Sequence, residues 1–231
     1  MVDDGSTDNS KAVVSAFKDN RIKYFYQENQ ERSSARNHGL QNVQGKYICF
    51  LDDDDYFSPK HLEILHSNIL ENGANTIYKV GAILKNEKTE YKEASINILD
   101  LTPVEYIIQN GISLFQLCFP KNIQQFQFDT KIKYGEDLKF ALLCILNNYK
   151  LIEIDVHSVV INDHSNRSSN SNTCTTLVSN YHDLKSVLVW ARSSGLSSNT
   201  ITKKLRKEKL KVTKRLLKEA CPKQIFKLWM T

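Results

Sequence analysis

The chain has 231 residues, of which 41% are hydrophobic and 25% are charged, and this composition is typical of a folded protein with one large domain. No run of residues approaches the roughly 20 apolar positions that a membrane-spanning helix needs, and the first residues lack the pattern of a secretion signal. The net charge of +5 is unevenly distributed, because residues 203–231 carry eleven basic residues against two acidic ones. A mildly acidic body therefore precedes a strongly basic tail.

The five cysteines are scattered and odd in number, and no two of them have Cys-x-x-Cys spacing. This arrangement predicts neither a zinc site nor a disulfide framework. Cys49 and Cys144 lie in apolar runs and are predicted to be buried thiols. These features together suggest a reducing, cytoplasmic setting.

Predicted strands and helices alternate along the first 70 residues. The apolar run Tyr47–Leu51 has the pattern of a strand that is buried on both faces. The alternation predicts an α/β domain with a largely parallel sheet. The elements expected here are a helix after Asp8–Ser10, a strand at Ile22–Tyr26, a helix at Ser33–Val43, the strand at Tyr47–Leu51 and a helix that Pro59 opens.

The second half of the chain predicts a domain end and a helical extension. Residues 162–176 are rich in serine and asparagine and should form a loop, so we expect a domain over 1–161 and an extension over 177–231. The elements expected here are two or three strands in Thr76–Lys92, helices at Pro103–Asn110 and Glu136–Asn147, a strand at Leu151–Ile161, and helices at Leu177–Arg192 and Ile201–Ala220.

Four consecutive carboxylates, Asp52–Asp55, directly follow the predicted strand at Tyr47–Leu51. Such a cluster is unfavourable unless a cation or exposure to solvent relieves the repulsion. Ligands bind at the carboxyl ends of parallel strands, and Mg²⁺ or Mn²⁺ combines a few carboxylates with substrate phosphates, so the cluster indicates a metal–diphosphate site. An acidic turn that caps the next helix is the alternative. A calcium loop is disfavoured, because Phe57 stands where its glycine is required.

Three further segments carry polar groups at element boundaries. Val2–Asp8 is a strand end followed by a turn, whose aspartates could accept a hydrogen bond from a nucleotide base. Ser33–Gly39 contains Arg36 on a predicted helix, where it could meet a base or a phosphate. Tyr134–Leu138 places two carboxylates at a helix start, where they could act as a general base or simply cap the helix. Each segment alone is also compatible with ordinary turn, surface or capping chemistry.

Together the four segments resemble the family 2 glycosyltransferases, which have the GT-A fold, a mixed sheet flanked by helices. The resemblance rests on Val2–Asp8, Ala35–Gly39, Leu51–Asp55 and Gly135–Asp137, in matching order over roughly residues 1–164. It implies an inverting transfer of sugar from a nucleotide-sugar donor, with a UDP-sugar preferred through the resemblance alone, to a glycan or lipid-linked acceptor in surface polysaccharide synthesis.

The resemblance also implies a role for individual residues. Asp3 and Asp4 match the acidic pair that contacts uracil, and Arg36 matches an arginine near the nucleotide. In the acidic motif, Asp52 matches the residue near the ribose and donor sugar, and Asp54 matches the residue on the Mg²⁺ or Mn²⁺ ion. Asp55 extends this motif. Asp137 matches the catalytic base, with Glu136 as its neighbour and possible substitute. His164 resembles part of a segment that closes over the diphosphate, and it is a further candidate metal ligand, although a solvated loop histidine is the alternative.

One departure from the family concerns the start of the chain. Family members begin with a strand, a helix and a second strand ahead of the segment that matches Val2–Asp8, whereas Val2 is nearly the first residue here. We expect the chain to be a fragment of a longer protein, with a short form that binds nucleotide weakly as the alternative. Either way, activity of the chain as written is in question.

The basic tail predicts an amphipathic helix. An ideal helix over Ile201–Ala220 gathers apolar side chains on one broad arc and lysines on the other, and an apolar, aromatic end follows. The pattern is compatible with contact between residues 201–231 and the inner face of a membrane, and equally with packing of the arc on the domain. No nucleic-acid partner is expected, because no nucleic-acid-binding motif accompanies the charge. Rival functions are a non-catalytic nucleotide-binding remnant and a nucleotidyltransferase.

Overall fold

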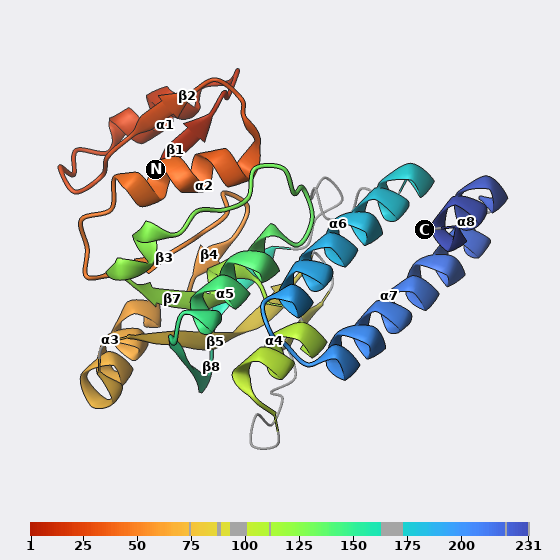
Figure 1. The fold of residues 1–231 in the computed structure, drawn as a ribbon. Helices are drawn as coiled ribbons and strands as arrows, with labels where there is room; N and C mark the ends of the chain where they lie inside the picture. Colours follow the sequence, from red (N-terminus) through yellow and green to blue (C-terminus); the bar gives the residue numbers. More distant parts are fainter. Residues whose placement is uncertain are drawn as a thin grey trace.

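The computed structural model describes residues 1–73, 75–86, 89–92, 101–110, 112–162, 173–219 and 221–230. Helices and strands alternate through the first part of the chain, as predicted, and three helices end it. Figure 1 shows the N-terminal elements above the central sheet, at the upper left, and the C-terminal helices α6 to α8 at the right. No helix in the described part of the chain is both long enough and apolar enough to cross a bilayer.

The N-terminal elements form a small layer of their own. Strand β1 (Val2–Asp4) pairs in parallel with β2 (Phe25–Gln27), and α1 (Ser10–Ala16) connects them. Gly5 has a φ of +88°, and a Cβ there would lie 2.8 Å from the Asn29 backbone nitrogen, so the turn after β1 requires glycine. Helix α2 (Glu31–Gln41) packs against β1 and carries Arg36 toward the rest of the molecule.

The central sheet has six strands. Its order is β3-β7-β5-β8-β4, with β6 paired to β5. Among its described pairs only β5 and β8 run in parallel, so the prediction of a largely parallel sheet is wrong here, whereas the mixed sheet that the resemblance implied is confirmed. The strands are β3 (Tyr47–Cys49), β4 (Tyr56–Phe57), β5 (Thr76–Lys85), β6 (Glu90–Lys92), β7 (Leu117–Pro120) and β8 (Lys150–Asn162).

The prediction of a parallel sheet failed because the sequence pattern does not determine strand direction. Apolar periodicity identifies a strand but not its direction, and β7 returns between β3 and β5 against both of them. The chain enters β7 through a short 3-10 turn, η1 (Leu114–Gln116), and leaves it through η2 (Lys121–Gln125).

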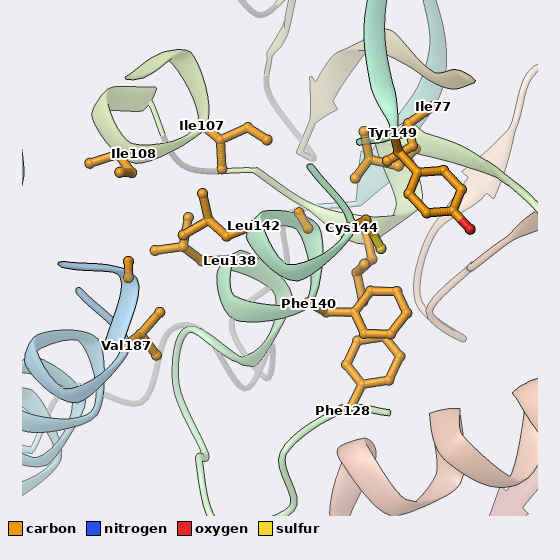
Figure 2. Packing of buried hydrophobic residues seen from close by; sticks show 14 of the residues in the cluster. Ile77, Ile107, Ile108, Phe128, Leu138, Phe140, Leu142, Cys144, Tyr149 and Val187 are labelled. Carbon is orange, nitrogen blue, oxygen red and sulfur yellow. The ribbon is translucent and has the colours of Figure 1, made fainter. Parts of the chain in front are cut away.

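The main core lies between the sheet and helices α4 (Pro103–Asn110), α5 (Glu136–Leu146) and α6 (Cys174–Ser193). Figure 2 shows α5 at its centre, with Leu138 and Leu142 turned toward Ile107 of α4 and Val187 of α6. On the other side of α5, Phe140 stacks on Phe128 with ring centroids 4.0 Å apart. Helix α3 (His61–Asn72) covers a second, smaller cluster.

The C-terminal helices pack on this core. Helix α7 (Ser198–Lys218) runs beside α6, and its buried Ile201 and Leu216 belong to the arc that the sequence predicted. Helix α6 starts at Cys174, where Thr173 caps it through the Thr176 N–H, so the loop predicted to extend through residue 176 ends earlier. Helix α8 (Pro222–Trp229) was not expected from the sequence.

Two cysteine predictions need correction. Cys174 and Cys221 form a disulfide with Cα atoms 6.4 Å apart, although no disulfide was predicted. Their sequence separation of 47 carries no signal, and the fold brings them together because the start of α6 packs against the α7–α8 turn. Cys144 is buried as predicted, but Cys49 is only partly buried.

Candidate functional site

The acidic cluster lies in the turn between β3 and β4. The Asp55 backbone N–H donates to the Asp52 carbonyl oxygen at 3.2 Å and closes the turn. One carboxylate oxygen each from Asp52, Asp54 and Asp55 lies within 4.8 Å of the other two. Asp55 is buried and accepts a hydrogen bond at 3.0 Å from the Asn162 N–H of β8, while Asp53 is exposed. The turn therefore gathers three of the four carboxylates.

The second pair of carboxylates lies at the start of α5. Gly135, with a φ of +84°, provides the left-handed residue that begins this helix, and Glu136 and Asp137 occupy its first turn. Their side chains are 5% and 22% exposed, so both lie in an environment that disfavours charge. Plain surface capping of a helix would leave such carboxylates in solvent.

Arg36 joins the two acidic sites. Its Nη1 donates to Asp137 Oδ1 at 2.7 Å and to Glu136 Oε1 at 3.2 Å. Its Nη2 donates to Asp52 Oδ1 at 3.3 Å. The Arg36 side chain is only 12% exposed, and its guanidinium carbon lies over the Phe128 ring, 5.7 Å from the ring centroid. One buried cation thus holds the acidic turn after β3 against the start of α5.

This arrangement perturbs the protonation of Asp137. Burial raises its pKa to about 7, although Arg36 acts in the opposite direction, and Glu136 and Asp52 raise it further. Burial alone would lower the pKa of Arg36, but the carboxylates around it more than offset this and hold the pKa above its ordinary value. Asp137 is therefore a carboxyl group that titrates near neutral pH beside a fixed positive charge.

Asp3 and Asp4 lie apart from this network, at the end of β1. Asp3 is buried and accepts hydrogen bonds from the Ser6 N–H at 2.7 Å and from the Tyr24 hydroxyl, which lower its pKa. Asp4 accepts at Oδ1 from Gln27 Nε2 at 2.7 Å and from the Gln30 N–H at 2.9 Å. In the described part of the chain, these hydrogen bonds stay within the β1–α2 segment, so both aspartates also stabilise the turn.

His164 lies outside the described residues. So does most of the Ser/Asn-rich segment that was predicted as a loop. The role of His164 as a metal ligand therefore remains a prediction.

Comparison with known proteins identifies the family. The chain matches the family described as glycosyl transferase family 2 over residues 1–128, which is more than half of its length. The chain belongs to this family. The resemblance drawn from the four sequence segments is therefore confirmed, and the acidic turn and Arg36 lie within the matched residues.

Curated relatives of this family 2 chain carry related names. An uncharacterised glycosyltransferase of Rickettsia conorii is 36% identical over 138 residues, which cover 54% of this chain and 22% of that protein. Glycosyltransferase GlyA of Streptococcus pneumoniae is 44% identical over 73 residues, which cover 31% of this chain and 10% of that protein. The chain thus spans about a fifth of the Rickettsia protein and a tenth of GlyA.

Solved structures confirm the GT-A fold of this family 2 chain. The structure of S. aureus TarS residues 1–349 in complex with UDP-GlcNAc superposes with a TM-score of 0.69 at 18% identity, over 90% of this chain and 61% of that one. A longer TarS structure gives a TM-score of 0.63 at 16% identity. At such identities the likeness establishes the architecture.

Two residues that shape the site were missed by the sequence interpretation. Asn37 accepts from the Phe128 N–H at 2.7 Å and donates to the Phe128 carbonyl oxygen at 3.0 Å. This pair of hydrogen bonds fixes the Phe128 ring beneath Arg36. Asn37 follows Arg36 directly in the segment Ala35–Gly39, so the motif contained a signal, whereas Phe128 lies in a stretch without any motif.

Proposed function

We propose that the chain is the donor-binding and catalytic part of a glycosyltransferase that moves a sugar from a nucleotide-sugar to an acceptor hydroxyl with inversion at the anomeric carbon. The observation that carries this proposal is the position of Arg36. It contacts Asp52 of the acidic turn and Asp137 of α5 at once, so a cation-binding group and a candidate base lie on either side of one guanidinium. Donor and acceptor chemistry require this proximity.

The acidic turn suits a hard divalent cation. Three carboxylate oxygens within 4.8 Å of one another offer the oxygen ligands that Mg²⁺ and Mn²⁺ prefer, and substrate phosphates would complete the shell. Asp54 and Asp55 would hold such an ion, and Asp52 would lie between it and Arg36. A bound divalent ion would neutralise charge on the departing nucleoside diphosphate.

Asp137 is the proposed general base. Its pKa of about 7 allows it to be ionised at neutral pH and still accept a proton from an acceptor hydroxyl. Arg36 orients the carboxylate through Oδ1, and the buried Glu136 keeps a second carboxylate next to it. With the base on the acceptor side and the departing diphosphate on the opposite side of the sugar, the acceptor hydroxyl would displace the diphosphate from the anomeric carbon in a single step.

Asp4 is the proposed contact for the nucleotide base. Both of its hydrogen bonds within the described residues go to Oδ1, so Oδ2 can accept an imide N–H such as that of uracil. Asp3, on the buried side of the same turn, stabilises the backbone conformation that positions Asp4. A UDP-sugar is the proposed donor, and the TarS complex with UDP-GlcNAc is consistent with that choice.

Titration calorimetry with UDP and Mn²⁺ tests the donor site. We expect binding that needs the metal and that falls at least about tenfold in Asp54→Ala, because one metal ligand is lost. Asp53→Ala is the matched control, since Asp53 neighbours the cluster but is exposed and does not belong to it. Binding of UDP without metal, or equal loss in both variants, would contradict the assignment.

Release of UDP from UDP-sugars tests catalysis separately. The wild-type chain should release UDP from a suitable donor, and Asp137→Asn should stop this release while leaving UDP affinity within about twofold. If the wild-type chain binds UDP with metal but releases none from any donor, the chain is a nucleotide-binding module without turnover. Full activity in Asp137→Asn would exclude Asp137 as the base.

The C-terminal helices are the proposed contact with an anionic membrane that carries a lipid-linked acceptor. Ile201 and Leu216 of the apolar arc of α7 are buried, but large apolar side chains remain exposed among the lysines on both α7 and α8. Trp229 lies over Lys209 at 4.7 Å and donates to Thr213 Oγ1, so it is fixed beside basic residues. The exposed apolar residues are Leu210, Leu217, Phe226, Trp229 and Met230.

Vesicle sedimentation tests this contact. The wild-type chain should sediment with vesicles of phosphatidylcholine and phosphatidylglycerol and not with phosphatidylcholine alone, because the basic face requires anionic lipid. Phe226→Ser should weaken sedimentation several-fold, whereas Leu62→Ser, equally exposed on the distant helix α3, should not. Equal sedimentation of both variants would count against the proposed surface.

A further inference from the structure

Two free cysteines lie opposite each other in the central sheet. Cys49 of β3 pairs with Cys118 of β7 in antiparallel register. The Lys121 N–H donates to the Lys46 carbonyl oxygen at 2.9 Å, and these two residues extend this register by one position beyond Tyr47 and Pro120. Since hydrogen-bonded and non-hydrogen-bonded pairs alternate along an antiparallel ladder, Cys49 and Cys118 form a non-hydrogen-bonded pair, in which side chains approach most closely. The backbone separation of such a pair, about 4.5 Å, lies within the range that a disulfide spans.

A buried histidine lies beside this pair. His61 is 2% exposed, stacks on Phe57 with centroids 3.9 Å apart, and shares a hydrogen bond of 2.9 Å between Nδ1 and Ser158 Oγ. Its Nε2 has no hydrogen-bond partner of ordinary geometry among the described residues. The ring is nevertheless close enough to Cys49 to influence its thiol.

The environment of Cys49 favours the thiolate. A hydrogen bond from Cys118 lowers the pKa of Cys49 to about 6 against the effect of burial, and His61 lowers it further. Burial and the same contact raise the pKa of Cys118, so one sulfur of the pair is the nucleophile and the other keeps its proton. Cys49 is also the more exposed of the two.

The other cysteines provide a contrast within the same molecule. Cys144 is fully buried in the main core, and burial raises its pKa to about 12. Cys174 and Cys221 are already joined to each other. In the described part of the chain, the combination of partial exposure, a facing thiol and a nearby imidazole therefore belongs to Cys49.

We propose that Cys49 and Cys118 form a peroxide-reactive dithiol that closes into a cross-strand disulfide, which a small thiol reductant reopens by thiol–disulfide exchange, with His61 as the proton acceptor of the dithiol. The Cys49 thiol gives its proton to His61, and the Cys49 sulfur attacks one oxygen of hydrogen peroxide. The O–O bond breaks, Cys49 becomes a sulfenic acid, and the departing hydroxide takes that proton from His61 and leaves as water. The Cys118 sulfur then attacks the Cys49 sulfur and the S–O bond breaks. The second hydroxide leaves as water with the Cys118 proton, which His61 can relay. One peroxide is reduced to two waters and two thiols are oxidised to one disulfide.

Peptide mapping of the full chain tests the site. After treatment with equimolar hydrogen peroxide and digestion without reductant, mass spectrometry should find the peptides of Cys49 and Cys118 cross-linked, and dithiothreitol should separate them. Before oxidation, iodoacetamide at pH 7 should modify Cys49 at least about 100-fold faster than Cys144. Failure to find the cross-link, or equal alkylation of Cys49 and Cys144, would overturn the proposal.

Two variants separate the chemical steps. In Cys118→Ser the second thiol is absent, so Cys49 should stop at the sulfenic acid and be trapped by dimedone. His61→Gln should slow oxidation about tenfold. His66→Gln, exposed on the same helix, should leave the rate unchanged. A Cys118→Ser protein without a dimedone adduct on Cys49, or equal oxidation rates in the two histidine variants, would refute the proposed chemistry.

Discussion

Replacing Asp137 by asparagine removes a negative charge whose burial destabilises the folded state. The side chain is 22% exposed and has two carboxylates near it, Glu136 and Asp52, with Arg36 as the compensating cation. Asparagine has nearly the same shape and can still accept the hydrogen bond from Arg36, but it carries no charge. We therefore expect Asp137→Asn to abolish sugar transfer and, above neutral pH, to stabilise the protein.

The size of this effect follows from the pKa of Asp137. The fold raises it from 3.8 to about 7. At about 1.4 kcal/mol for each pKa unit, ionising Asp137 in the folded state costs about 4 kcal/mol more than in the unfolded chain. Because solvent reaches part of the side chain, we halve this value and expect asparagine to raise the free energy of unfolding by about 2 kcal/mol at pH 8.

The pH range of the effect follows from the direction of the shift. The folded pKa lies above the unfolded one, so the folded protein binds the proton more tightly. The stability that Asp137 contributes is complete below pH about 4 and is lost as the pH rises to about 7. At pH 5 the wild-type side chain is largely protonated in the folded state, so the advantage of the variant over wild type should be much smaller than at pH 8.

Urea unfolding at pH 5 and pH 8, with EDTA present, measures both free energies. The matched control is Asp129→Asn, because the Lys139 ammonium at 2.6 Å holds the pKa of Asp129 below its usual range. That variant should lose stability, and by a similar amount at both pH values. If Asp137→Asn gains no more at pH 8 than at pH 5, the attribution of the raised pKa to a buried charge is wrong.

Three further predictions concern activity and stability. The rate of transfer should rise as the pH is raised through about 7, because Asp137 must be ionised to act as a base, and a pH–rate profile of UDP release measures this. Leu142→Ala, at a fully buried position, should lower the free energy of unfolding by about 2–5 kcal/mol, whereas the exposed Leu70→Ala should change it by less than about 0.5 kcal/mol in urea titrations. Gly135→Ala should cost about 1–2 kcal/mol in the same assay, because φ is +84° but the nearest atoms lie 3.8 Å from an added Cβ, so only backbone strain opposes it.

The sequence was informative wherever one helix or strand determined the outcome. Periodicity predicted both ends of α4 correctly. It also predicted the start of α5 correctly and its end to within one residue, since each helix buries a continuous apolar face. The strand at Tyr47–Leu51 was found, although its ladder ends at Cys49, two residues before the acidic turn. These features depend on neighbouring residues, and the sequence contains that information.

Features that depend on pairing across the chain were not predictable in the same way. The direction of β7 and its place between β3 and β5 depend on pairing with strands that lie far from it in the sequence. The disulfide joins residues 47 apart because two helix ends meet in space. The contact of Arg36 with Asp137 spans 101 residues, so the motifs indicated both residues but not that they touch.

Arg36 divides one guanidinium between Asp52 and Asp137, and this makes the two sides of the site thermodynamically linked. A cation bound at the acidic turn would attract the Asp52 carboxylate and weaken its interaction with Arg36. The interaction between Arg36 and Asp137 would then strengthen, which favours the ionised form of Asp137. Linkage then requires that loss of the Asp137 proton strengthens binding of that cation by the same factor. Affinity for a divalent ion would rise as the pH passes through about 7, and filling of the donor side would itself prepare the base.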